Sequence, residues 1–501
     1  MTILQDKQNK IEQLREMGIE LYPSFSAKEH VKRNRCSAVA MMKPEDAGLS
    51  MAICGRIVRF NNKGAITFIH IEDEYGKAQV VFKKANFSEE QYRLFKEKLI
   101  ERDDFIYVTG TFFITNSGEK SLDATSFELL AKSHQPLPVI KEVVSEDNAV
   151  KQYGEFNDKE ERFRQRYADL AVNDEVRRRF KLRARVISHI RSFLDIKMGM
   201  IEVETPILQP VYGGAAARPF TTHHNQLNQN MFLRISFELY LKRLLVGGFD
   251  SVYEIGRDFR NEGVSYKHNP EFTMLEFYKA YANLYDCMDI VEEMLKNIIW
   301  AIFFPKYEFD YQEHHLDFTT FNRITMRDAI LEKTGIDVYQ YQQTIVVLLA
   351  LQNKGLSVPI KDMEQDYGKT VLDIFEHFVE KDLIQPTFVY EYPKSVSPFA
   401  KDAKREGYVE RFELFIAGME FGNAFTELND PDIQEARFRE MAALYKNGED
   451  EETPFDEDYL NAMRYGMPPN TGFGMGIDRL MMLLTNQSSI KEVILYPHLK
   501  S

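Results

Sequence analysis

The sequence predicts an α+β chain of two domains, in which a five-stranded β-barrel precedes a larger antiparallel β-sheet flanked by helices. Three observations predict this fold class. Short strand-like segments crowd residues 51–130, helical periodicity marks Glu175–Met198, and two strand-like segments joined by a polar loop occupy Tyr253–Tyr278. The chain has 501 residues, which is enough for two or three domains and a sizeable core.

Composition narrows the classes of protein that fit. The apolar content of 44% and the charged content of 28% are typical of a globular protein. The net charge of −14 argues against nucleic-acid binding over the whole surface, so any nucleic acid would be recognised at a restricted patch. Cys36, Cys54 and Cys287 are far apart, which argues against a disulfide framework or structural zinc. No apolar run could span a bilayer and the charged start is unlike a signal peptide, so we expect a cytoplasmic protein without membrane contact.

The N-terminal domain is expected at 1–145, with a charged linker at 146–160. Residues 1–48 indicate locally basic helices. Five short strands follow, with the sequences MAICGRIVRF, AITFIHIED, AQVVFKK, DFIYVTGTFFIT and SFELLAK. With one helical interruption at Ser88–Leu99, this pattern predicts a small Greek-key barrel of the oligonucleotide-binding type.

Barrels of this type bind single-stranded nucleic acid by stacking its bases on aromatic side chains. Phe68 and Phe82 could provide such stacking, and Arg56 and Gln79 could form hydrogen bonds to base edges. Core packing is the alternative for each phenylalanine, and periodicity alone favours it.

The C-terminal domain is expected at 161–501 and begins with the helix at Glu175–Met198. The arginines of this helix indicate a solvated or subunit-facing surface rather than a phosphate site. The strand MIEVETPIL follows and is interrupted at Pro206. Residues 281–400 are expected to be largely helical, and their sequence indicates no particular chemistry.

The hairpin at Tyr253–Tyr278 is the strongest candidate for a site. Alternation along its second strand places Phe272, Met274, Glu276 and Tyr278 on one face. The loop carries a dense group of charged side chains and one histidine: Arg260, Glu262, Lys267 and His268. A solvated loop is the alternative, but a carboxylate in the middle of an aromatic strand, at Glu276, favours a site for a polyanion such as a nucleoside triphosphate.

Further polar groups occur in Gly-rich or strand-like surroundings. The small residues Gly213–Ala217 allow a close approach to a ligand, and Glu238 follows among apolar residues. Arg479 lies in the first turn of a helix, where the helix dipole disfavours a cation, so we expect an anionic ligand there. A Rossmann site is excluded because Ile477 replaces the third glycine, and a P-loop because Met363 replaces the upstream glycine.

Together these segments resemble a known family. The strings FRNEG and HNPEF resemble the second signature motif of class II aminoacyl-tRNA synthetases, the helix and strand around Thr205-Pro206 resemble the first, and GFGMGIDRL resembles the third. With GGAAARPF, HNPEFTMLEFY and GMEFGNAFTELNDP, the similarity extends over nearly the whole chain and is to the bacterial-type class II lysyl-tRNA synthetases.

The resemblance implies roles for individual residues. The implied ATP-binding residues are Arg260, Glu262, His268, Phe272 and Arg479. Of these, Arg260 and Arg479 would hold the phosphates and be catalytic, Glu262 would accept from the adenine amino group, and Phe272 would stack on adenine. The implied lysine-binding residues are Gly214, Glu238, Glu276, Tyr278, Asn423, Phe425 and Glu427. The implied magnesium ligands are Glu413 and Glu420. The positions that match anticodon-binding residues are Arg56, Phe68, Gln79 and Glu128.

The implied partners are L-lysine, ATP and tRNA(Lys), with a homodimer formed through the first motif. A buried ammonium requires paired carboxylates, and Glu276 and Glu427 would supply them. A related enzyme for aspartate or asparagine would require a cation or an amide there instead. The other alternative is a catalytically inactive tRNA-binding relative, against which the intact Arg260, Glu262 and Arg479 argue.

Overall fold

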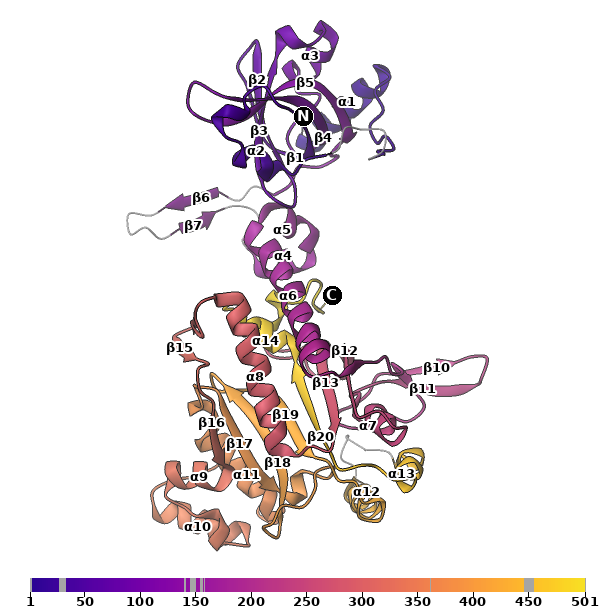
Figure 1. Ribbon diagram of the computed structural model, residues 1–501, viewed down its shortest axis with the longest axis vertical. Coiled ribbons are helices and arrows are strands. Elements are labelled where there is room, and N and C mark those ends of the chain that lie inside the picture. Colours follow the sequence, from indigo (N-terminus) through magenta and orange to yellow (C-terminus); the bar gives the residue numbers. More distant parts are fainter. Residues whose placement is uncertain are drawn as a thin grey trace. The chain divides into compact units, whose positions relative to one another are not determined.

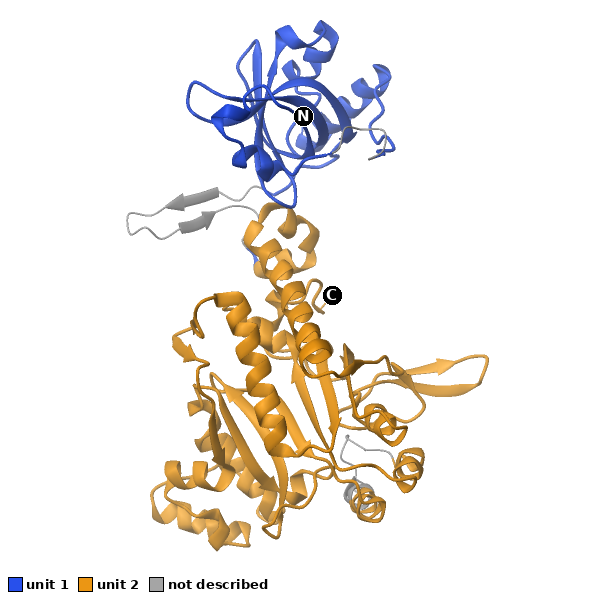
Figure 2. Ribbon diagram, in the orientation of Figure 1, with its two compact units in different colours: residues 1–158 blue, residues 159–501 orange. Residues whose placement is uncertain are grey.

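The computed structural model describes residues 2–26, 33–138, 141–144, 150–153, 156, 158–360, 362–445 and 455–500. The chain forms two compact units, Met1–Asp158 and Lys159–Ser501, which Figure 2 shows in blue and orange. None of the described helices is long and apolar enough to cross a membrane.

The N-terminal unit is a closed barrel with the strand order β1-β2-β3-β5-β4. Its strands are β1 (Ser50–Asn62), β2 (Ile66–Glu72), β3 (Lys77–Lys83), β4 (Phe105–Ile114) and β5 (Lys120–Ala131). Its helices are α1 (Ile3–Glu16), α2 (Cys36–Met41) and α3 (Glu89–Lys96), with short 3-10 turns at η1 (Pro44–Asp46) and η2 (Lys84–Asn86). Only β3 and β5 pair in parallel, and β4 closes the barrel on β1. The prediction of a five-stranded barrel is confirmed.

The helix between β3 and β4 begins where a capping box predicts it. The Ser88 hydroxyl accepts from the Gln91 amide, and the Gln91 side chain accepts from the Ser88 amide. The buried face of α3 packs into the barrel, where the Phe95 ring stacks on Phe82 at 4.1 Å. Phe82 is therefore a core residue, as periodicity indicated, and does not offer a stacking surface.

Part of the predicted linker at 146–160 lies outside the described residues, namely 146–149, 154–155 and 157. Beside it, β6 (Lys141–Val144) pairs antiparallel with β7 (Val150–Tyr153). The helices α4 (Lys159–Arg164) and α5 (Arg166–Val172) then open the C-terminal unit.

The C-terminal unit contains an eight-stranded sheet with the order β16-β17-β18-β19-β20-β13-β12-β8 (Figure 1). Its strands are β8 (Ile201–Glu202), β12 (Ser251–Phe259), β13 (Glu271–Ala280), β16 (Asn322–Thr325), β17 (Thr387–Pro393), β18 (Tyr408–Ile416), β19 (Met419–Thr426) and β20 (Asn470–Gly476). The six central strands pair antiparallel, and the two outer pairs, β16–β17 and β8–β12, are parallel. The prediction of an antiparallel sheet flanked by helices is confirmed.

One face of this sheet is covered by helices and forms the core. The covering helices are α6 (Asp174–Ser192), α8 (Leu284–Phe303) and α14 (Ile477–Leu484). Figure 1 shows α8 lying across the sheet, where its side chains pack on Phe412, Phe473 and Leu275. On the opposite face, α7 (Glu238–Val246) packs against β12 and β13 through Val252 and Tyr278.

Smaller elements complete the unit. They are η3 (Phe193–Lys197), β9 (Leu208–Gln209), β10 (Thr221–His224), β11 (Gln229–Leu233), β14 (Glu308–Tyr311), β15 (His314–Asp317), α9 (Met326–Thr334), η4 (Val338–Gln340), α10 (Thr344–Asn353), α11 (Tyr367–Phe378), η5 (Glu380–Asp382), η6 (Lys394–Val396), α12 (Pro431–Tyr445), α13 (Glu457–Arg464) and η7 (Ile490–Glu492). The expected helical content of 281–400 is correct for α8–α11, but β14–β17 were not predicted.

The strand expected at MIEVETPIL is shorter than predicted. Only Ile201–Glu202 pairs with β12, because Thr205 leaves the sheet to bind a side chain and Pro206 has no amide hydrogen to donate. The backbone N–H and hydroxyl of Thr205 donate to Glu254 Oε2 at 3.0 and 2.7 Å.

Candidate active site

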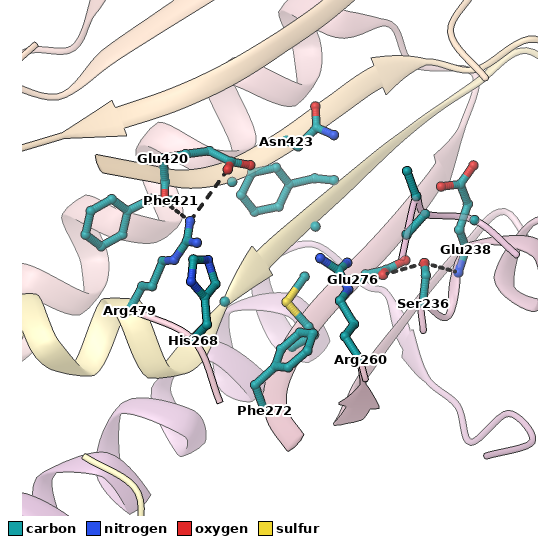
Figure 3. Close-up of a pocket in the computed structure, with 18 of the residues that line it drawn as sticks. Ser236, Glu238, Arg260, His268, Phe272, Glu276, Glu420, Phe421, Asn423 and Arg479 are labelled. Carbon is teal, nitrogen blue, oxygen red and sulfur yellow. Dashed lines mark hydrogen bonds and ion pairs between the residues drawn. The ribbon is translucent and has the colours of Figure 1, made fainter. Parts of the chain in front are cut away.

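A cavity of about 390 Å³ lies on the sheet face opposite the core, which is a usual size for a small-molecule site. It is lined by the β12–β13 hairpin, β19, β20 and the starts of α7 and α14. Figure 3 shows that Arg479, Glu420 and His268 gather at one end, and that Glu238, Ser236 and Glu276 gather at the other.

The hairpin creates this surface by strict alternation along β13. Phe272, Met274, Glu276 and Tyr278 line the cavity, while Leu275 and Phe277 are buried in the core on the other face. This alternation is what the sequence predicted. Because β12 and β20 pair with β13 on both sides, the positions of these side chains are fixed by the sheet.

The cavity contains two arginines from different elements. Arg479 Nη1 donates to the backbone oxygen of Glu420 at 2.6 Å and lies 3.5 Å from Glu420 Oε2. The Arg260 guanidinium lies 5.2 Å from the centre of the Phe272 ring. A cation for a phosphate and an aromatic ring for a base are therefore close together in the cavity. Burial and the nearby charge of Arg479 hold the pKa of His268 below its ordinary value, which favours a neutral imidazole at pH 7.

The acidic end is centred on Glu276, whose side chain is 5% exposed. The Ser236 hydroxyl donates to Glu276 Oε1 at 2.9 Å, and the Tyr278 hydroxyl donates to Oε2 at 3.3 Å. Burial, with the nearby charges of Asp258 and Glu238, raises the pKa of Glu276 well above its ordinary value. Burial and neighbouring carboxylates disfavour the ionised form of Glu276, and a cation bound beside it would stabilise that form.

Gly214 allows the backbone to reach this end of the cavity. Its φ of +85° disfavours any L side chain, and a Cβ there would lie 2.9 Å from Glu238 Cβ and 3.0 Å from Ser236 Oγ. Gly214, Glu238, Asn423 and Phe425 all line the cavity with Glu276 and Tyr278, so six of the seven residues in the expected lysine-binding group are brought together.

Glu427 does not line the cavity. It is 1% exposed, and its Oε2 contacts the ammonium of the buried Lys242 at 2.5 Å. Lys242 also contacts Glu238 Oε1 at 2.6 Å, so one internal cation connects two of the expected lysine-binding carboxylates. Sequence reasoning missed this lysine, although a lysine four residues after Glu238 on a mainly apolar helix was a visible signal.

The two expected magnesium ligands differ in their surroundings. Glu420 lines the cavity, but Glu413 does not; it forms an ion pair with Arg411 and accepts from the Tyr392 hydroxyl at 2.8 Å. Burial raises the pKa of Glu413 above its ordinary value despite the charge of Arg411. No group of three His, Cys, Asp or Glu side chains suited to a metal occurs in the described parts of the chain. The donor set would therefore have to be completed by oxygens of a bound ligand.

On the barrel, three of the four expected anticodon-binding positions lie on the adjacent strands β1, β2 and β3, on one outer face. Strand register places Arg56 opposite Glu72 and places His70 opposite Gln79, while Phe68 lies two residues before His70 and is half-buried. Arg56 Nη1 donates to the backbone oxygen of Asp103 at 3.2 Å.

Glu128 stands opposite Tyr107 on β4, which stands opposite Cys54 on β1, so Glu128 lies on the same side of the sheet as Arg56, two strands away. It also lines a groove with Met17, Glu20 and Glu90. A different carboxylate, Glu119, lies beside His70 at 3.3 Å and interacts with Gln79, and these contacts hold its pKa below its ordinary value, the Gln79 contact most strongly. The sequence offered no signal that Glu119, in a turn, would reach this face.

Comparisons with known proteins agree with both units. A family model described as tRNA synthetases class II (D, K and N) matches residues 158–500, and a model of the OB-fold nucleic acid binding domain matches residues 51–130. The chain is 45% identical to the lysine–tRNA ligase of Chloroflexus aurantiacus over 494 residues, which cover 98% of this chain and 96% of that protein. It is 44% identical to the lysine–tRNA ligase of Carboxydothermus hydrogenoformans, covering 97% and 96% of the two chains, and 42% identical to that of Listeria monocytogenes, covering 99% and 96%.

Proposed function

The chain belongs to the lysine–tRNA ligases within the class II tRNA synthetases (D, K and N), and we infer from this membership that it activates L-lysine with ATP and transfers the lysyl group to tRNA(Lys). The observation that carries this function is the polarity of the cavity. Arg479 provides positive charge at one end, Arg260 lies between this end and Glu276, and buried carboxylates line the other end (Figure 3). Lysyl-adenylate carries complementary charges, because its lysyl part has two ammonium groups and the phosphate that joins it to adenosine is negative.

The chemistry needs no nucleophile from the protein. The lysine carboxylate attacks the α-phosphorus of ATP and pyrophosphate leaves, and a terminal hydroxyl of the tRNA then attacks the carbonyl carbon while AMP leaves. Arg260 and Arg479 would stabilise the negative charge that develops on the phosphate oxygens, and Phe272 would stack on adenine while Glu262 accepts from its amino group. Catalysis would thus come from positioning and fixed charge.

The carboxylates would hold the two ammonium groups of lysine. The residues proposed to surround the substrate are Gly214, Glu238, Glu276, Tyr278, Asn423, Phe425 and Glu427, the last through Lys242 rather than by lining the cavity. Aspartate and asparagine carry no second ammonium, so a pocket built from buried carboxylates disfavours them. This is why the related enzymes for those two amino acids are not the favoured alternative.

Magnesium would enter with ATP. Glu420 lines the cavity next to Arg479, and its oxygens together with phosphate oxygens suit this ion. Glu413 would join as a ligand only if its ion pair with Arg411 were exchanged for the metal. Magnesium bound there would offset the negative charge of the phosphates, together with Arg260 and Arg479.

The barrel would bind the anticodon, and the chain would act in the cytoplasm as a homodimer. The observation that supports a dimer is a group of apolar side chains left in solvent near the first motif: Ile196, Ile201, Ile207 and Leu208, which are 82%, 50%, 44% and 47% exposed. Exposed apolar groups at this density indicate a protein contact.

Exchange of labelled pyrophosphate into ATP, measured with each of the twenty amino acids and without tRNA, tests the proposed function. We expect exchange that depends on lysine. Equal exchange with aspartate or asparagine would refute the substrate, and no exchange with any amino acid would favour an inactive tRNA-binding relative.

A further inference from the structure

Lys242 lies behind the acidic end of the cavity with no exposed surface. It follows Glu238 by one turn of α7, and its ammonium lies 2.6 Å from Glu238 Oε1 and 2.5 Å from Glu427 Oε2. The rings of Tyr278 and Phe399 enclose it, at 5.9 and 5.3 Å from the ammonium nitrogen. The contact joins α7 to the end of β19, the two elements that carry Glu238 and Phe425 to the substrate.

The charges in this region are unequal. Glu238, Glu276 and Glu427 are each at most 5% exposed, and Lys242 pairs with the first and the last of them, so full ionisation of these four groups gives a net charge of −2. A lysine molecule brings two ammonium groups, which matches this value. Without Lys242 the same pocket would hold one carboxylate too many for its substrate, and a buried unpaired charge is strongly unfavourable.

We propose that Lys242 is a positioning residue for the amino-acid substrate, because its ammonium sets the net charge of the pocket to the value that two substrate ammonium groups neutralise. The proposal rests on the proposed function and extends it to a residue that does not touch the substrate. Lys242 acts through Glu238 and Glu427, whose carboxylates it holds in place by ion pairs.

The surrounding groups determine how the pocket responds to pH. The groups that face Lys242, Glu238 and Glu427 from the packed elements are Glu276 and Tyr278 of β13, Tyr459 of α13 and Cys287 of α8. Asp258 of β12 acts on Glu276, and Arg243 of α7 acts on Tyr459. Burial opposes the charged form of Lys242, but Glu238 and Glu427 outweigh it and raise the pKa of Lys242 above its ordinary value, so the residue stays charged. Burial also raises the pKa values of Glu276 and Glu427 above their ordinary range.

The directions of these pKa shifts predict how the KM for lysine depends on pH. Free carboxyls with raised pKa values must lose protons when lysine binds, so the KM for lysine falls as pH rises. Removal of the Lys242 cation raises the carboxyl pKa values further and moves this fall to higher pH. The defect is therefore largest at low pH and shrinks as pH rises. A lysine that only braced the fold would change KM by the same factor at every pH.

The test is the Lys242→Met variant, assayed by pyrophosphate exchange between about pH 6.5 and 8.5, below the ordinary pKa of a lysine side chain. We expect the KM for lysine at the lowest pH to rise roughly thirtyfold or more, the scale for loss of one partner of a buried charge pair, and the rise to shrink with pH. The KM for ATP should stay unchanged. A rise of equal size at every pH, or no rise, would overturn the proposal.

Arg243→Met is the matched control. Arg243 is the neighbouring cation on α7, but it pairs with Asp456 at 2.8 Å instead of with pocket carboxylates. Its loss should lower the melting temperature and leave the pH profile for lysine in place.

A double variant keeps the test decisive if Lys242→Met alone fails to fold. Lys242→Met/Glu427→Gln removes one charge of each sign, so the pocket keeps a net charge of −2 and its dependence of KM on pH should follow the wild type, whatever the absolute KM. A profile displaced to higher pH in this variant would overturn the proposal.

Calorimetric titration of lysine separates the proposal from the function on which it rests. If the wild-type chain binds lysine but forms no adenylate, the proposed function fails, while the pH dependence of binding in the same variants still decides the role of Lys242.

Discussion

Glu276→Gln should separate lysine recognition from folding, because the structure gives this carboxylate opposite effects on the two. Gln is close in shape to Glu and keeps an acceptor for the Ser236 hydroxyl, which lies 2.9 Å from Glu276 Oε1. What it removes is the charge that would pair with a substrate ammonium in a site that is 5% exposed. Loss of a buried charged partner costs about 2–5 kcal/mol, so the KM for lysine should rise by roughly thirtyfold to several thousandfold.

Glu276→Gln should weaken lysine binding but should not lower the stability of the folded protein at high pH. A carboxyl whose pKa is raised in the folded protein favours folding below its ordinary pKa, and this contribution is lost as pH rises through the folded-state pKa. At pH 8 without lysine, Glu276→Gln should therefore melt at the same temperature as the wild type or at a higher one. In the wild type, the KM for lysine should fall as pH rises, and the variant should show a flatter dependence.

Pyrophosphate exchange at saturating ATP and differential scanning calorimetry provide the two readouts. An unchanged KM for lysine would refute the assignment of Glu276 as an ammonium partner. A large fall in melting temperature would show instead that the carboxylate is part of the structural core.

Four further outcomes follow. Arg260→Ala should slow adenylate formation by roughly two to three orders of magnitude with folding intact, as measured by single-turnover exchange, and near-normal rates would place the phosphates elsewhere. Phe68→Ala should lower the efficiency of tRNA charging roughly tenfold or more, on the scale of one lost base-stacking contact, without changing pyrophosphate exchange; equal losses in both assays would mean that the barrel unfolds. Glu119→Gln should impair charging more than Glu128→Gln, because Glu119 lies beside His70 and interacts with Gln79, next to Phe68; the reverse order would move the anticodon site toward Glu128. Sedimentation should show a dimer, and a fully active monomer would contradict the role given to Ile196 and Ile201.

Local patterns in the sequence predicted the position of a side chain wherever a single strand or helix determines that position. Period-two alternation in β13 correctly assigned Glu276 and Phe277 to opposite faces, and the helix expected at Ser88–Leu99 is present as α3. The class of fold and the cavity residues from the hairpin could be predicted for this reason.

Contacts between distant segments could not be predicted in this way. Glu427 turns toward Lys242, which precedes it by 185 positions in the numbering, and Glu413 accepts from Tyr392 of the neighbouring strand, 21 positions earlier. Glu128 and Glu119 lie on the same strand or its adjoining turn, and only the closure of the barrel decides which of them reaches Gln79. Such choices depend on packing energies summed over many residues rather than on a local pattern.

The pairing of β13 with a strand on each side has a consequence for the length of the substrate. Phe272 and Glu276 are four residues apart on this strand, so the proposed adenine and ammonium positions are separated by about 13 Å of rigid backbone at the usual rise per residue. Neither end can slide toward the other without breaking the ladders to β12 and β20. An amino acid one methylene shorter than lysine, such as ornithine, could satisfy the adenylate end or the carboxylate end but would be strained to reach both. A missing methylene is usually worth roughly 10- to 200-fold in discrimination, and here the inextensible strand, rather than the shape of the pocket wall, would enforce it.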